Sequence, residues 1–157
     1  MLLDSFDLAI LSRYQHDTLK PAKTLGEAVG LSPAAVQRRL KRLREGGVIS
    51  AEVAVVSPDA VGMPVTCIVN VDLEREGGPD LDRFGRKMES CAEVQQCYYV
   101  TGVADFVMVV VTADMRRYEA FTREQLLEDP NVKSFTTMVV LNRVKVGLAV
   151  PLPAASR

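Results

Sequence analysis

The chain has 157 residues, of which 48% are hydrophobic; this is enough to bury the core of one ordinary domain or of two small ones. Its formal net charge of −1 combines a surplus of three positive charges over residues 1–50 with a surplus of four negative charges over residues 51–157. We therefore expect a polyanion partner for the first part and exclude the acidic remainder from that contact.

The first 50 residues read as three short helices. Helical spacing of apolar residues, with proline and glycine at the expected ends, predicts them over residues 4–14, 21–29 and 33–44. Ser32 is placed to cap the third helix, and Gly46 to stop it. The residues expected on the inward faces are Phe6, Ile10, Leu11, Tyr14, Val36, Leu40 and Leu43.

A strand-like stretch and a proline and glycine boundary follow. The β-branched run VISAEVAVV, residues 48–56, predicts one or two short strands, which would complete a winged helix-turn-helix. Proline and glycine then punctuate residues 57–64. We therefore expect one domain over residues 1–50, a strand linker over 51–64, and a second domain over 65–157.

The remaining chain alternates strands and helices in the order βαββαβ. Strands are expected over residues 65–73, 94–100, 106–112 and 132–146, with helices before the second strand and before the fourth. The fold class is therefore α+β, with a ferredoxin-like four-stranded antiparallel sheet and two helices on one face. The third strand, FVMVVVT, is apolar on both faces, so we expect a second copy of the chain to cover the open face.

The third helix carries five Lys or Arg within residues 38–44 and no acidic residue before Glu45. A helical projection with the apolar stripe inward puts this charge on the outer face, whereas an ordinary solvated helix mixes both signs. We expect this helix to enter the DNA major groove and its amino-terminal residues to reach base edges. The expected DNA contacts are Ser32, Ala34, Ala35, Gln37, Arg38, Arg39, Lys41 and Arg42.

Within this set the expected roles differ. Small residues near the helix start, together with Gln37 and Arg38, are the expected base readers, while Lys41 and Arg42 are the expected phosphate contacts. The role of Arg39 stays undecided, because this residue lies at the edge of the inward face. There its side chain can either pack its stem on the core or extend its guanidinium to a phosphate.

No catalytic or metal-ligating constellation stands out. The three cysteines form no CxxC pair and no Cys/His cluster, and we expect reduced, mostly buried thiols, no metal and no cofactor. The first residues hold acids where a signal peptide is basic, and no apolar run reaches the about 18 residues of a membrane span, so we expect a cytoplasmic protein without a membrane partner.

Several segments resemble the Lrp/AsnC family of bacterial and archaeal transcription regulators. They are LDSFDLAIL, VGLSPAAVQRRLKRLREGGVI, CYYVTGVADFVMVV and DPNVKSFTTMVVLNRVK, and their order spans almost the whole chain. The resemblance implies a DNA-binding regulator, not an enzyme, with a regulation-of-amino-acid-metabolism domain that forms dimers and larger tetramers or octamers. It also implies a small amino-acid effector between subunits, at Gly102, Val103, Ala104, Asp105, Met115, Thr136, Met138, Val139 and Val140.

Three alternatives accompany this interpretation. Val103 and Ala104 stand where many members carry a polar residue and then an aromatic one, which leaves the effector's identity open, and Asp105 is open to a turn-forming role. An Lrp-like haem-biosynthesis decarboxylase would need several histidines in the second domain, but the single histidine is His16. A metabolite-binding interaction module would not need the basic helix.

Overall fold

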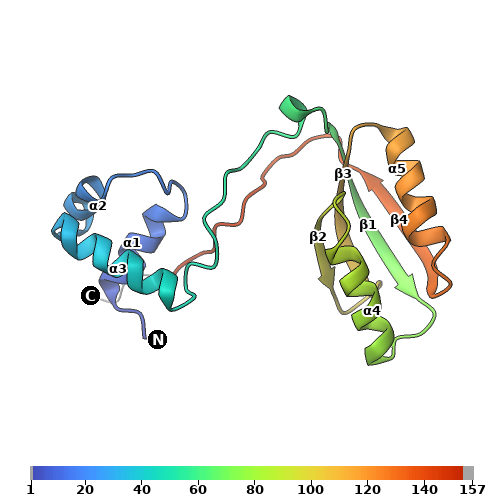
Figure 1. Ribbon diagram of the computed structural model, residues 1–157, viewed down its shortest axis with the longest axis horizontal. Coiled ribbons are helices and arrows are strands. Elements are labelled where there is room, and N and C mark those ends of the chain that lie inside the picture. The colour runs from blue at the N-terminus through green and yellow to red at the C-terminus, as the bar shows by residue number, and fades with distance from the viewer. Residues whose placement is uncertain (1, 154–157) are drawn as a thin grey trace. The chain divides into compact units, whose positions relative to one another are not determined.

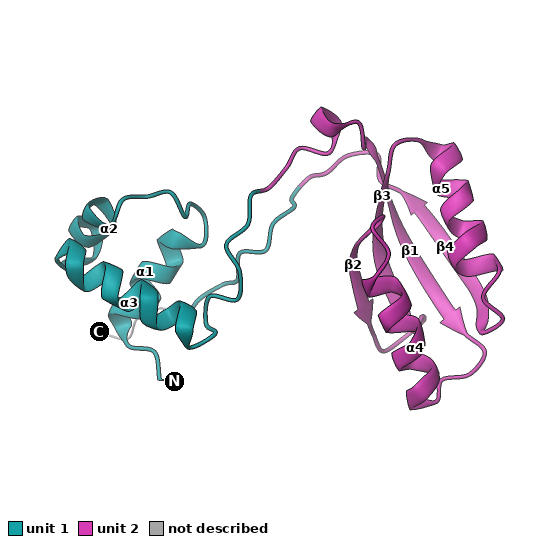
Figure 2. Ribbon diagram, viewed as in Figure 1, with its two compact units in different colours: residues 1–54, 145–157 teal, residues 55–144 magenta. Residues whose placement is uncertain are grey.

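A computed structural model describes residues 2–153 of the chain (Figure 1). The chain divides into two compact units, residues 1–54 with 145–157 and residues 55–144 (Figure 2). Residues 1 and 154–157, which the predicted domain ranges include, lie outside the described residues.

The first unit contains three helices, α1 (Ser5–Tyr14), α2 (Ala22–Val29) and α3 (Pro33–Glu45). All three were predicted; Gly30 and Ser32 act at the helix ends as expected, and the Asp4 cap was not foreseen. Asp4 caps α1, Gly30 ends α2 in the left-handed conformation with φ of 73°, and the Ser32 hydroxyl accepts a hydrogen bond from the Ala35 N–H at 3.2 Å. The core that joins the helices consists of Ile10, Tyr14, Leu25, Val36 and Leu40.

Two expectations about this unit are wrong. The residues from 48 to 57 contain no strand, so the wing does not form; valine-rich composition favours a strand, but a strand also needs a hydrogen-bonding neighbour. Phe6, expected on the inward face of α1, is 40% exposed, and the guanidinium of Arg39 lies 5.4 Å from its ring centroid.

The second unit has the predicted βαββαβ order. The elements are β1 (Val65–Leu73), α4 (Gly78–Glu89), β2 (Val94–Tyr99), β3 (Phe106–Thr112), α5 (Met115–Thr122), the π-helical turn η2 (Arg123–Leu127) and β4 (Val132–Val139). The strands form one antiparallel sheet in the order β2-β3-β1-β4, and a short 3-10 turn, Asp59–Val61, precedes β1. The last strand ends at Val139 and not at the predicted residue 146.

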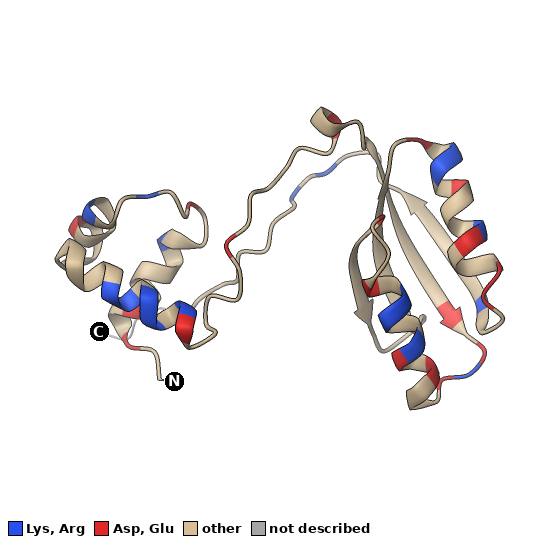
Figure 3. Cartoon of the chain, in the orientation of Figure 1, with Lys and Arg blue, Asp and Glu red and all other residues tan. Residues whose placement is uncertain are grey.

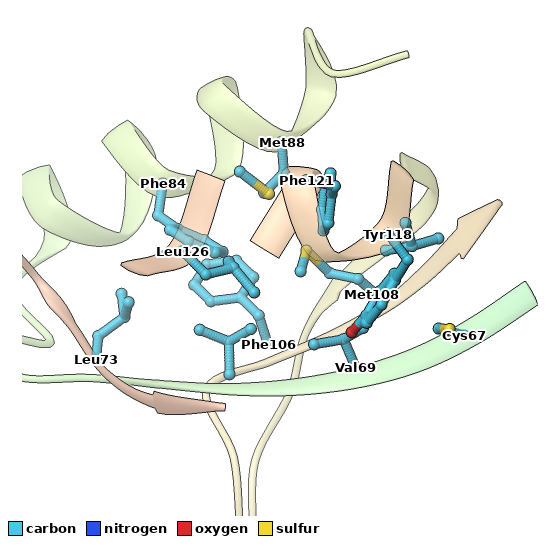
Figure 4. Close-up of a cluster of buried hydrophobic side chains, with 12 residues drawn as sticks. Cys67, Val69, Leu73, Phe84, Met88, Phe106, Met108, Tyr118, Phe121 and Leu126 are labelled. Carbon is cyan, nitrogen blue, oxygen red and sulfur yellow. The ribbon is translucent and has the colours of Figure 1, made fainter. Parts of the chain in front are cut away.

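Both helices pack on one face of this sheet. Figure 4 shows the helical side chains Phe84, Met88 and Phe121 above Val69 and Met108 of the central strands. All five are fully buried, and the rings of Phe84 and Phe106 lie 4.8 Å apart. Alternate residues of β1 and β3 are buried, as the period of two in the sequence predicts. The buried residues of α4 follow the helical period of 3.6, so the two patterns meet in one core.

The opposite face of the sheet has no helix over it within the described residues. Strand register places Ile68, Val107 and Val109 there, with Met138 of β4 beside Ile68. These strand residues are only partly buried, and Met138 is 46% exposed. An apolar sheet face of this kind is typical of an interface with another molecule.

Candidate nucleic-acid interface

Helix α3 separates an apolar face from a basic one. Val36, Leu40 and Leu43 are buried, whereas Arg38 and Lys41 point to solvent. Figure 3 shows the Lys and Arg residues gathered along α3, and the single acidic residue of that helix, Glu45, ends it. The helix is long enough, at 13 residues, to present more than three turns to a DNA groove.

The amino-terminal end of α3 is small and open. Ser32 and Ala34 are exposed, Ala35 is partly buried, and Gln37 is exposed one turn further on. Because the first turn of a helix has free N–H groups and a partial positive charge, this end suits an approach to phosphate oxygens. The four residues can thus approach a polyanion without rearrangement of the core.

A close backbone contact fixes the turn between α2 and α3. The Leu31 N–H donates to the Gly26 carbonyl at 2.9 Å, and a Cβ atom added at Gly26 would lie 2.4 Å from the Leu31 carbonyl oxygen. Only glycine permits this approach. The contact therefore sets the angle at which α3 leaves the turn.

Two cations of α3 bind carboxylates of α1. The side chain of Asp7 is fully buried, and it accepts from Arg39 at 2.8 Å and from Arg42. Arg39 also contacts Asp4 at 2.7 Å. The Asp7 N–H and Arg39 donate to Asp4 and hold the pKa of that carboxyl below its usual value, and Asp4 and Asp7 raise the pKa of Arg39. Sequence reasoning did not foresee these pairs.

A third cation, Arg44, binds a residue beyond the helix. Its Nε donates to Glu52 at 2.8 Å, and its Nη2 donates to the Tyr14 hydroxyl at 2.8 Å. Tyr14 in turn donates to Glu52. Hydrogen bonds from Arg44 and Tyr14 lower the pKa of Glu52 to about 2. This triad ties the start of the linker to α1 and α3.

The other two cations of the helix remain available. Within residues 2–153 no carboxylate lies within ion-pair distance of Arg38. Lys41 lies 3.7 Å from Glu45, with 74% of the lysine side chain exposed, and such an exposed pair contributes little. Arg38 and Lys41 are thus the cations of α3 that give up the least ion-pair energy when they bind a phosphate.

The residues expected to bind an effector lie in three places along the sheet. Gly102, with φ of 119°, Val103 and Ala104 form the turn before β3, and Met115 follows the other end of that strand. Seven strand residues separate these two places by about 20 Å. The remaining members, Thr136, Met138, Val139 and Val140, lie on or just after β4. One chain alone does not bring these residues together.

The carboxylate of Asp105 already has one partner. It accepts from the Leu73 N–H at 2.7 Å, and its own backbone N–H donates to the Val71 carbonyl at 3.0 Å. Asp105 therefore fastens the turn to the end of β1 and keeps its second oxygen for another donor. Val140 instead lines a polar hollow of about 260 Å³ with Thr66 and Arg143, a site that the sequence did not indicate.

From residue 2 to residue 153, no three His, Cys, Asp or Glu side chains gather as a metal ion requires. No helix in that range combines the length and the apolar character needed to cross a membrane.

Two family models match the chain. Residues 3–44 match the AsnC-type helix-turn-helix domain, and residues 66–150 match the Lrp/AsnC ligand binding domain. Together these ranges contain the three helices of the first unit except Glu45, and the sheet of the second unit except Val65.

Similar proteins match this chain over nearly its whole length. The HTH-type transcriptional regulator y4tD of Sinorhizobium fredii is 51% identical over 152 residues, which cover 97% of this chain and 90% of the relative. The proline dehydrogenase transcriptional activator of Rhizobium radiobacter is 33% identical, with 91% and 92% covered. The crystal structure of the transcriptional regulator NMB0573 of Neisseria meningitidis with L-Met superposes with a TM-score of 0.88 at 27% identity, and covers 96% of this chain and 97% of that one.

Proposed function

The chain belongs to the Lrp/AsnC family of transcriptional regulators, and from this premise we propose that α3 binds operator DNA while the second domain binds an amino-acid-like effector. The proposal assigns DNA binding to residues 1–50, the linker to 51–64, and effector binding and self-assembly to 65–157. The observation that supports it best is the exposed basic face of α3 beside an open, capped helix start.

We assign base reading to the amino-terminal half of α3. Gln37 can hydrogen-bond to a base edge, and Arg38 can bind guanine through two hydrogen bonds, while the small side chains of Ala34 and Ala35 allow close approach. The Ser32 end of the helix and Lys41 then bind phosphates. Because Arg39 and Arg42 already bind the Asp7 carboxylate, we no longer assign phosphate contacts to these two residues.

The effector proposal rests on both similarity and chemistry. The similar Neisseria protein was crystallised with L-Met, and this chain has a matching ligand binding domain. The second oxygen of Asp105 can accept from an ammonium group, and Met115 and Met138 can form an adaptable apolar wall. Because one chain separates these side chains, we propose that the effector site forms between copies.

Self-assembly also follows from the open sheet face. A second copy placed over Ile68, Val107, Val109 and Met138 would bury their apolar side chains. Two copies present two α3 helices, which suits a pair of operator half-sites about one helical turn of DNA apart. We propose a dimer as the smallest DNA-binding form, with a tetramer or octamer as larger forms.

We propose a regulator and not an enzyme, working in the cytoplasm. A decarboxylase related to this family would need several proton-donating histidines in its second domain. The one histidine of the chain, His16, is exposed and belongs to the first unit. A metabolite-binding module without DNA affinity leaves the basic face of α3 unexplained.

Genome-wide mapping of bound DNA, followed by binding assays on the recovered operators, tests the proposal. Lys41→Ala should lower the slope of log K against log[salt] by about 0.9, because one phosphate contact is lost. Lys133→Ala, an exposed lysine of β4, should leave the slope unchanged. Equal slopes for both variants would reject α3 as the DNA-binding surface.

Sedimentation and operator binding with a panel of amino acids test the effector. An effector must bind two assembly states with different affinity if it is to shift them. Absence of any change with every amino acid would leave a DNA-binding protein without this regulation.

A further inference from the structure

We infer that Asp7 is a positioning residue for DNA recognition, which holds two arginines of α3 away from phosphates. The inference rests on the DNA-binding function proposed above. It divides the basic helix into restrained cations, Arg39 and Arg42, and free cations, Arg38 and Lys41.

The contacts of Asp7 leave little of its carboxylate unused. One oxygen accepts from Arg39 at 2.8 Å. The other accepts from Arg42 and from the Asp4 N–H, the latter at 3.2 Å. The side chain has no solvent exposure, so neighbouring protein groups must supply its hydrogen bonds.

Arg39 is restrained from several sides. Its Nη1 lies within 2.7–2.9 Å of both Asp4 oxygens, and its guanidinium lies 5.4 Å from the centre of the Phe6 ring. Only 22% of the side chain is exposed. Arg42 is more open at 48% exposed, but it shares the buried carboxylate. Both arginines therefore have defined partners before any DNA arrives.

Competition between carboxylate and phosphate decides which cations bind DNA. An arginine that leaves Asp7 for a phosphate leaves a buried carboxylate with fewer compensating groups, and this is strongly unfavourable. Lys41 leaves only an exposed partner, Glu45, and Arg38 leaves none among residues 2–153. Phosphates should therefore bind the free cations first.

The restraint has a consequence for specificity. Phosphate contacts raise affinity for every DNA sequence, so two fewer of them reduce binding to non-specific DNA. The same ion pairs fasten α3 to α1 and hold the base-reading residues Gln37 and Arg38 in a fixed position. Asp7 thus favours sequence reading over general attraction to the backbone.

Asp7→Asn in the full chain tests the inference, with binding to a random-sequence duplex measured at several salt concentrations. The asparagine keeps the side-chain shape but removes the charge, so Arg42 loses its ion pair and becomes free, while Arg39 keeps its pair with Asp4. We expect the salt slope to rise by about 0.9 for the freed arginine, so that the affinity loss between 50 and 200 mM salt grows about 3.5-fold. A side chain that served folding alone would not increase the slope.

Two controls identify the cause. Asp17→Asn removes the same charge from the first unit, but Asp17 makes no ion pair with α3, so its slope should stay at the natural value. Adding Arg39→Gln and Arg42→Gln to Asp7→Asn should cancel the increase. An increase of equal size in Asp17→Asn, or no increase in a folded Asp7→Asn chain, overturns the inference.

A second set of variants applies if Asp7→Asn does not fold. In the natural background, Lys41→Gln should lower the slope by about 0.9, while Arg39→Gln and Arg42→Gln should leave it almost unchanged. Equal losses in all three overturn the inference but leave DNA binding by α3 intact. A natural chain that binds no duplex at any salt concentration overturns the proposed function, and the inference with it.

Discussion

Replacement of Gly26 by alanine tests the contact that sets the angle of α3. The added Cβ would lie 2.4 Å from the Leu31 carbonyl oxygen, whereas ordinary contact begins at 3.4 Å, so the turn must move by about 1 Å. Overpacking of this kind costs about 1–3 kcal/mol, and the better helix propensity of alanine returns about 1 kcal/mol. We expect a net loss of up to about 2 kcal/mol and weaker operator binding.

Hydrogen exchange read by peptide mass spectrometry locates this effect, because it follows the two units separately. Peptides from α1, α2 and α3 should lose protection, and those from the sheet should not. Gly85→Ala is the matched control: nothing lies within 4 Å of a Cβ at this position in α4, so it should stabilise the second unit by about 0.5–1 kcal/mol. Unchanged protection and operator affinity in Gly26→Ala would refute the reasoning.

Two further predictions concern the linker triad and the core. Because Arg44 and Tyr14 lower the pKa of Glu52 from 4.5 to about 2, its ionised form stabilises the first unit fully above about pH 4.5, and this contribution is lost as the pH falls toward 2. In Glu52→Gln, the free energy of unfolding of the first unit should depend less on pH between about 4.5 and 2. An unchanged pH dependence would contradict the role of the triad. Phe84→Ala, which removes a fully buried ring 4.8 Å from Phe106, should lower the free energy of unfolding of the second unit in urea by about 3–5 kcal/mol. Val103→Ala, at a position 93% exposed, should change it by less than about 0.5 kcal/mol, and similar losses in both would refute the assigned core.

Local signals accounted for most of the elements. Caps, prolines and glycines act within a few residues, so the end of α2 and the start of α3 could be read from Gly30 and Ser32. Period-two and 3.6-residue patterns similarly predicted the sheet and its two helices. The same rules failed for residues 48–56, where valines supplied strand propensity but the described chain supplied no paired strand.

The candidate sites were less accessible to local reasoning. A helical projection places Arg42 on the outer face of α3, and in the structure its side chain is half exposed. The projection carries no information about α1, so it could not reveal that Asp7 accepts from Arg42. Similarly, the family resemblance implied a ligand site at the Gly102 turn, but the structure places Met115 at the other end of β3 from that turn.

The sequence by itself determined the two-domain order and the helix and strand faces. It also revealed a strongly basic helix in a chain whose formal net charge is only −1. These properties depend on neighbours within one or two turns of chain, and periodicity records them directly. The tertiary structure decided which cations are available, because ion pairing depends on distances between residues more than 30 positions apart, as between Asp7 and Arg39. Burial of one carboxylate therefore changes how the positive charge of α3 can be used.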